Sequence, residues 1–217
     1  MTRIHVFCEG QTEDVFIREV LAPHFNRRDI WMNPIIVRTG PRGKGGVTSY
    51  GKIRWQINQK CREDASAWVT TMLDFYGLPQ DFPGQTSRGS SLERAGAVVA
   101  AFQQDIGHRN FVANLVVHEF EGLLFSAPDA FGAWFDVGNV VQNVAAIRGA
   151  FKTPEHIDDG PASAPSKRIL DICANYDKVA HGSLIALDIG LDAIRRECPL
   201  FDAWVQRLEA IPAGANT

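Results

Sequence analysis

The sequence lacks several features that would assign a class of protein directly. Its four cysteines are dispersed and form no C-x-x-C pair, so we expect free thiols. No apolar run approaches the roughly 18 residues that a membrane-spanning helix needs, and no basic-then-apolar leader precedes the first apolar segment. We therefore expect a cytoplasmic protein with no membrane partner.

A strong excess of charge of either sign is also missing. The net charge is −3, which gives no global basic field, so any contact with nucleic acid has to use a local patch or a bound metal ion. With 217 residues, 45% hydrophobic and 22% charged, the chain has the composition of an ordinary globular protein. No internal repeat or low-complexity tract is present. This length suits one well-packed domain with an appendage.

The segment Arg3–Asp14, RIHVFCEGQTED, combines an apolar run with an abrupt acidic end. The run predicts a buried strand, and the residues after it predict a turn into a helix. Ligands of open α/β sheets collect outside the carboxyl ends of the strands, where Glu9 would lie. Glu13 falls in the first helical turn, where an acid is often present for the helix dipole alone. The helix dipole explains Glu13 well but Glu9 poorly, because Glu9 precedes the helix.

Further apolar segments repeat this pattern. Residues 34–38 predict a second strand, residues 67–73 predict a buried strand that ends at Asp74, and residues 111–117 predict one that runs into His118, Glu119 and Glu121. Predicted helices at 50–63 and 92–106 lie between them. This alternation predicts an α/β fold with a mostly parallel sheet of at least four strands flanked by helices.

The strand signal disappears after Phe125. We expect an α/β core at 1–126 and a helical extension at 127–217, packed on the core as one structural unit. The expected helical segments are 128–150, 166–175, 179–187, 191–196 and 200–210.

A glycine-rich segment, 39–48, lacks the spacing of a P-loop. One interpretation is a mobile linker. The other is a phosphate-contacting flap, because Arg42 and Lys44 place two cations among backbone amides.

The acids at the predicted strand ends have almost no histidine or thiolate company, and hard cations such as Mg²⁺ and Mn²⁺ prefer such oxygen ligands. Close carboxylates repel one another unless a cation neutralises them or some take up protons. Their convergence would therefore imply a metal, whereas any one of them alone is equally well explained as a surface acid. The candidate metal ligands are Glu9, Glu13, Asp74, Glu119 and Glu121.

Several motifs in order, EGQTE, DFYGLP, HEFEGLLF and DDGPASAPSKRI, resemble a bacterial family of unknown function. That family resembles the Toprim fold of topoisomerases, primases and OLD-type nucleases. In Toprim enzymes a glutamate and an Asp-x-Asp pair at strand ends hold Mg²⁺, and Glu9 and Asp74 match them. OLD-type nucleases add acids that Glu13, Glu119 and Glu121 match. The sequence departs from the pattern at Tyr76, which replaces the second acid of Asp-x-Asp.

The resemblance implies two-metal phosphodiester hydrolysis with Mg²⁺ or Mn²⁺. Glu9 and Asp74 would be catalytic, as would Lys167, with Arg168 beside it, because OLD-type nucleases are thought to use a C-terminal lysine. An alternative for Lys167 and Arg168 is a plain helix start. His118 is a candidate base or ligand, although a structural role is the simpler explanation.

The resemblance favours a nuclease acting on DNA or RNA, with an ABC- or OLD-type ATPase as partner, in anti-phage or mobile-element defence. A non-catalytic module that binds nucleic acid or the ATPase through a structural metal site is the alternative, favoured by Tyr76 and the negative net charge. Hydrolysis of, or group transfer from, nucleotide polyphosphates would use the same metal chemistry.

Overall fold

The structure is a computed structural model that describes residues 1–38, 49–136, 138–157, 160 and 163–212. The predicted glycine-rich loop 39–48, with Arg42 and Lys44, lies outside the described residues. In the described part, four strands form one parallel sheet in the order β2-β1-β3-β4. The strands are β1 (Thr2–Cys8), β2 (Ile30–Ile36), β3 (Trp68–Met72) and β4 (Phe111–Val112). The predicted fold class is therefore confirmed.

Strand β2 begins at Ile30, four residues earlier than predicted. Among the described strands it pairs with β1 alone, in the register Thr2↔Ile30 to Cys8↔Ile36. Because β2 is an edge strand, it tolerates Pro34, which has no amide to donate to a neighbouring strand.

The predicted strand 111–117 is shorter than expected, because β4 ends at Val112. Side chains accept the hydrogen bonds of the next two backbone amides. Gln103 Oε1 accepts from the Ala113 amide at 2.7 Å, and Thr71 Oγ1 accepts from the Asn114 amide at 3.1 Å. Pairing with the third strand resumes where the Val116 amide donates to the Leu73 carbonyl at 2.8 Å. The segment therefore still runs beside β3 and delivers its acids to the same edge.

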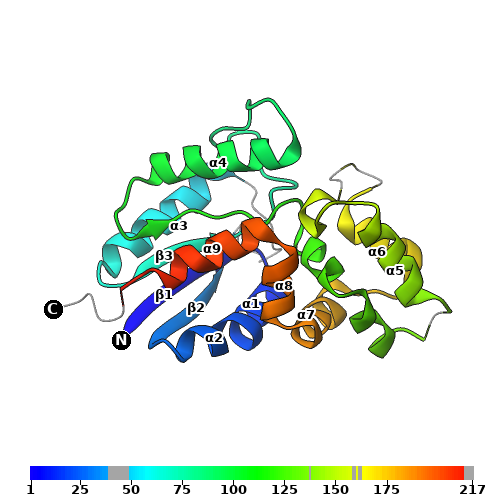
Figure 1. The fold of residues 1–217 in the computed structure, drawn as a ribbon. Helices are drawn as coiled ribbons and strands as arrows, with labels where there is room; N and C mark the ends of the chain where they lie inside the picture. The colour runs from blue at the N-terminus through cyan, green and yellow to red at the C-terminus, as the bar shows by residue number, and fades with distance from the viewer. Residues whose placement is uncertain (39–48, 137, 158–159, 161–162, 213–217) are drawn as a thin grey trace.

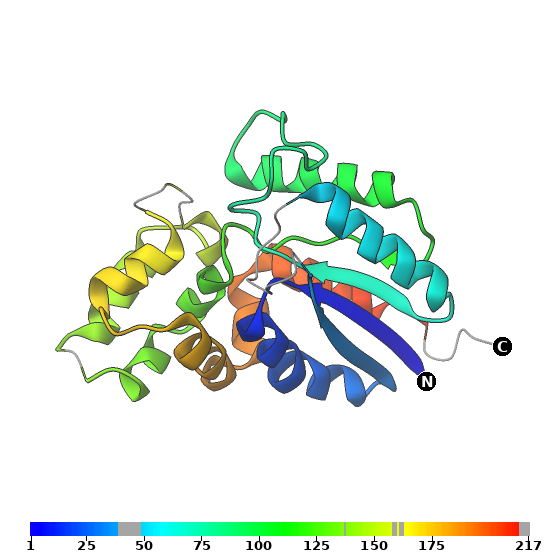
Figure 2. The same ribbon diagram turned by 180° about the vertical axis from the view of Figure 1, so that it is seen from behind.

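Helices α3 (Tyr50–Glu63) and α4 (Ser91–Ile106) cover one face of the sheet (Figures 1 and 2). Both agree with the predicted segments to within one residue. Ser90 and Glu93 form a capping box at the start of α4, and Gly107 ends this helix with φ = 63°. An edge-to-face contact between Phe102 of α4 and Phe111 of β4 joins this layer to the sheet.

The other face packs against α1 (Gln11–Phe16), α2 (Ala22–Asn26) and α9 (Pro199–Glu209). A π-helical segment, Ile17–Leu21, joins α1 to α2. Trp204 of α9 is 1% exposed, and its indole Nε1 donates to Thr70 Oγ1 of β3 at 3.0 Å. The C-terminal helix is thereby fixed to the centre of the sheet.

The remaining helices gather beyond the carboxyl ends of the strands (Figure 1). Their apolar side chains belong to the same hydrophobic cluster as β1, which is consistent with the expected packing of a helical extension on the core. The division at residue 126 itself stays a prediction. The segments are 3₁₀ helices Phe120–Ser126, Pro128–Ala133 and Pro154–His156, helices α5 (Val140–Gly149), α6 (Pro165–Ile172), α7 (Ser183–Ile189) and α8 (Leu191–Glu197), and the π-helical segment Lys178–Gly182.

All four cysteines are buried free thiols, as expected. Across the described ranges, no helix has both the length and the apolar character needed to cross a bilayer.

Candidate metal centre

The acids that follow β1 and β3 meet at the carboxyl edge of the sheet. Glu9 comes directly after β1, and Asp74 lies two residues after β3. The Asp74 amide donates to Glu9 Oε1 at 3.0 Å, so the side chain after one strand is fastened to the backbone after the next. A parallel sheet brings the two together because their strands are neighbours with carboxyl ends at one edge.

Backbone amides orient two further carboxylates. Glu13 Oε2 accepts from the Gly10 amide at 2.9 Å, which places this carboxylate at the N-terminus of α1. Asp74 Oδ1 accepts from the Phe120 amide at 2.9 Å, which draws the segment after β4 toward β3. Glu121 then enters the cluster from this segment.

The centre of the cluster is the ammonium group of Lys178. Its Nζ lies 3.1 Å from Glu13 Oε1, 3.4 Å from Asp74 Oδ2 and 3.4 Å from Glu121 Oε2. The carboxylate side chains are 2–11% exposed, whereas the lysine side chain is 37% exposed. Lys178 therefore reaches from the surface into a buried group of acids and neutralises part of its charge.

Close packing holds Lys178 in this position. Thr12 Oγ1 of α1 donates to the Lys178 carbonyl at 3.2 Å. Gly182 ends the same π-helical segment, and a Cβ atom there would lie 2.9 Å from Tyr176 Oη and 3.1 Å from Thr12 Cγ2. Only glycine allows the segment to approach α1 this closely.

Lys178 was not identified as a site residue from the sequence, which pointed to Lys167 and Arg168. Lys167 is exposed on α6. Arg168 Nε donates to the Ser163 carbonyl at 2.7 Å, and its guanidinium lies over the Phe151 ring. Among the described residues, the lysine in contact with Glu13, Asp74 and Glu121 is Lys178. No sequence motif or spacing identifies Lys178. The sequence could indicate only that buried carboxylates need a cation nearby, and not which residue supplies it.

Glu119 lies beside this cluster and faces α6. Its Oε2 accepts from the Ser166 amide at 3.0 Å, so the carboxylate caps the first turn of that helix. Its negative charge contributes to raising the pKa of Glu121. Of the five predicted ligands, Glu13, Asp74 and Glu121 converge on one point, and Glu9 and Glu119 flank it.

Burial shifts the acid–base equilibria of the cluster. Burial, assisted by the charge of Glu13, raises the pKa of Glu9 to about 7. The pKa of Asp74 lies well above its ordinary value for the same main reason, and burial also raises that of Glu121. Burial alone would lower the pKa of Lys178, but the surrounding carboxylates raise it by more, so its pKa lies above the ordinary value. The site therefore favours protons or other cations.

Two buried carboxylate oxygen atoms of the cluster have an ammonium group as their neighbour. Glu13 Oε1 and Glu121 Oε2 accept no hydrogen bond of good geometry, although both face the Lys178 ammonium. Hard divalent cations prefer such carboxylate oxygens. As the side chains stand, no set of three acidic, histidine or cysteine groups in the described ranges is arranged to hold a metal ion. Lys178 lies between three of the acids instead, so it would have to move for an ion to take that position.

His118 and Tyr76 flank the acids. His118 is buried with φ = 65°, and its carbonyl accepts from the Tyr76 amide at 2.8 Å. A positive φ is uncommon for histidine and marks a tight turn just before Glu119. The side chain of Tyr76, which stands where the Toprim pattern has an acid, is exposed.

The fold and this site define an α/β protein with an acidic cluster at the carboxyl edge of a parallel sheet. Residues 8–209 match the family described as Domain of unknown function (DUF4276), and the chain belongs to that family. No curated protein matches it. A solved structure of the C-terminal region of the Burkholderia pseudomallei OLD protein is similar to it, with 14% sequence identity and a TM-score of 0.42, over 97% of this chain and 100% of that chain.

Proposed function

We propose that the protein is a phosphodiesterase dependent on Mg²⁺ or Mn²⁺, a nuclease acting on DNA or RNA. The observation that carries this proposal is the convergence of Glu13, Asp74 and Glu121 with two buried oxygen atoms that lack hydrogen bonds. Such oxygens are costly to bury unless a cation faces them, a place that the Lys178 ammonium now takes and that Mg²⁺ or Mn²⁺ would take in its stead. The resemblance of the sequence motifs to OLD-type nucleases supports phosphodiester bonds as the substrate.

The carboxylates would hold the ions, with Glu9, Glu13, Asp74, Glu119 and Glu121 as the ligand set. Bound Mg²⁺ or Mn²⁺ would supply an activated water and stabilise the leaving oxygen. The amides of Gly10, Asp74 and Phe120 fix three of these carboxylates before any ion binds. Preorganisation of this kind lowers the cost of assembling a charged site.

We assign the cationic role to Lys178 and not to Lys167. Its ammonium already lies within 3.4 Å of three of the proposed ligands. If the acids held an ion, they would no longer need the ammonium of Lys178, which could then face negative charge on the phosphoryl oxygens. Its partly exposed side chain allows that movement.

The motif resemblance further supports an ABC- or OLD-type ATPase as the partner, and a cytoplasmic role in anti-phage or mobile-element defence. Mixing the protein with a purified ABC- or OLD-type ATPase from the same organism tests the proposed partner. Co-elution of the two proteins on size exclusion is the expected result, and separate elution would contradict it.

A non-catalytic module is the second candidate, and two observations favour it. Tyr76 replaces an acid of the Toprim pattern, and Lys178 already neutralises part of the charge of the acids without an ion. In that case the cluster would be a structural feature that orients the helical half on the sheet, and binding of nucleic acid or the ATPase would be the activity.

Cleavage of end-labelled DNA and RNA in Mn²⁺ or Mg²⁺, with and without the ATPase, separates the two candidates. We expect wild-type protein to cut at least one of them and Glu121→Gln to lose activity by orders of magnitude while staying folded. Glu19→Gln is the matched control, because Glu19 is exposed on the neighbouring π-helical segment and carries the same charge. Intact substrate in every condition would favour the binding module, and equal activity of Glu121→Gln and the wild type would mean that this acid cluster does not carry the cleavage.

A further inference from the structure

A groove runs along α3 on the face of the sheet away from α1 and α2. It consists of two adjoining hollows of about 460 and 300 Å³ that share Arg38, Trp55 and Gln56. Phe7 and Ile35 of the first two strands line its floor, and residues of α3 form its wall. Figure 2, in which α3 is cyan, shows this helix lying over the sheet.

The wall of the groove presents an exposed tryptophan. Trp55 is 65% exposed, although tryptophan usually buries most of its surface in a folded protein. The buried face of α3 uses Ile53, Ile57 and Cys61 instead, so Trp55 does not pack in the core. Its indole is available as a flat stacking surface.

Cations accompany this tryptophan in a protein whose net charge is −3. Arg38, Lys52 and Lys60 line the groove, against the single carboxylate of Glu63 among its described lining residues. The hollow of about 460 Å³ has Arg38 and Lys52 but no carboxylate among its described lining residues, whereas Lys60 pairs with Glu63 at 3.2 Å in the other hollow. Positive charge beside an exposed aromatic ring is the combination that binds single-stranded nucleic acid.

The groove begins at the same sheet edge as the acids. The Val37 amide donates to the Cys8 carbonyl at 2.9 Å, so Arg38 lies beside the chain that carries Glu9. Gln56 fixes this junction, because its side chain accepts from the Arg38 amide at 3.0 Å and donates to the Arg38 carbonyl at 3.1 Å. A polymer lying along α3 is thereby directed toward the candidate metal centre.

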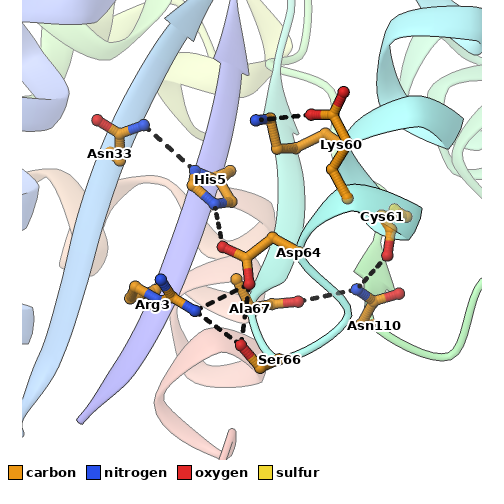
Figure 3. A network of polar contacts seen from close by, with 10 residues as sticks. Arg3, His5, Asn33, Lys60, Cys61, Asp64, Ser66, Ala67 and Asn110 are labelled. Atoms are coloured by element: carbon orange, nitrogen blue, oxygen red, sulfur yellow. Dashed lines mark hydrogen bonds and ion pairs between the residues drawn. The ribbon is translucent and has the colours of Figure 1, made fainter.

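A polar network lies at the Glu63 end of α3. His5 joins Asn33 of β2 to Asp64, the residue directly after α3, at 3.2 and 3.1 Å (Figure 3). Arg3 also pairs with Asp64, at 2.8 Å. Figure 3 shows Lys60 at the same end of the helix. From Lys52 to Glu63 the wall is about 16 Å long, at about 1.5 Å per helical residue.

We infer that this groove binds single-stranded DNA or RNA, with a base stacked on Trp55 and phosphates on Arg38 and Lys52. The inference rests on the proposed function for the cleavage of the bound strand, and it adds that the substrate is an unpaired strand. A duplex hides the faces of its bases in its own stack, so only an unpaired base can stack on Trp55.

The test is fluorescence anisotropy of labelled oligo(dT) and oligo(U) in EDTA at low salt, with a duplex of equal length as competitor. Working without divalent ions separates strand binding from cleavage, so a failure of either leaves the other measurable. We expect the single strand to bind more tightly than the duplex. Trp55→Ala should weaken binding about tenfold, and Trp55→Phe should retain most of it.

Arg38→Ala should weaken binding and reduce the slope of log affinity against log salt by about 0.7. Trp31→Ala is the matched control, because Trp31 is 50% exposed on β2 but does not line the groove. The absence of strand binding, preference for the duplex, or equal losses in Trp55→Ala and Trp31→Ala would each overturn the inference. An apolar peptide segment of another protein would then be the better occupant.

Discussion

Replacing Lys178 by methionine removes the cation from the acid cluster and keeps the length of the side chain. Glu13, Asp74 and Glu121 lose an ammonium group at 3.1–3.4 Å and remain buried. Breaking a buried ion pair by removing one partner costs about 3–5 kcal/mol. The ammonium is carried by a side chain that is 37% exposed, so solvent screening reduces the expected loss to about 2 kcal/mol.

This loss should be measurable by urea unfolding in EDTA at pH 8, where the acids are most charged. For a chain of this length it corresponds to a fall in Tm of about 4–8 °C. At pH 5 the deficit should shrink, because burial raises the pKa values of the acids and they take up protons in place of the lost cation. Divalent ions should stabilise Lys178→Met more than wild type, since no ammonium competes for the oxygens.

Lys60→Met is the matched control, because Lys60 forms an exposed ion pair with Glu63 three residues later in the same helix. Its expected effect is below about 0.5 kcal/mol. A Lys178→Met protein as stable as wild type at pH 8 in EDTA would refute the view that this lysine neutralises the acids. So would a deficit that is the same at pH 5 and pH 8.

Three further predictions follow from the same contacts. Burial raises the pKa of Glu9 from 4.5 to about 7, so the folded metal-free protein binds more protons than the unfolded chain in this range. Its free energy of unfolding should therefore fall as the pH rises from 5 to 8, and Glu9→Gln should flatten that slope. Gly182→Ala crowds Tyr176 and Thr12, so it should lower the free energy of unfolding by about 1–3 kcal/mol and weaken the stabilisation by divalent ions. Gly138→Ala, whose added Cβ meets no atom within 4 Å, should change neither the stability nor the effect of the ions. Trp204→Phe removes the bond to Thr70 and some buried area, so urea unfolding should show a loss of about 1–2 kcal/mol with unchanged ion binding; no loss would mean that α9 is held by other contacts.

The sheet was predictable because its strands have strong local signals. The apolar runs before Glu9 and Asp74 end in acids, and both runs are central strands in the structure. The early end of β4 was not predictable from its apolar run, because Gln103, Thr71 and Asn114 satisfy backbone groups that a strand would otherwise pair. These bonds join residues far apart in the sequence.

The acids of the site were predictable because a parallel sheet brings the residues after its strands to one edge. Their contact with Lys178 was not, because that lysine lies more than fifty residues from the nearest of these acids, in a π-helical segment with no motif. The position of Lys178 depends on Gly182 and Thr12, which let the segment approach α1. Tertiary packing, and no local pattern, completed the site.

Isothermal titration of Mn²⁺ into the metal-free protein at pH 8 measures whether the acid cluster binds a divalent ion. We expect saturable binding in the wild type, its loss in Glu121→Gln and Asp74→Asn, and no change in Glu19→Gln. We also expect more protons to be released on binding at pH 6 than at pH 8, because burial raises the pKa values of the proposed ligands and leaves them partly protonated at the lower pH. No saturable binding at millimolar Mn²⁺, or equal binding in Glu121→Gln and the wild type, would contradict a metal centre at this sheet edge.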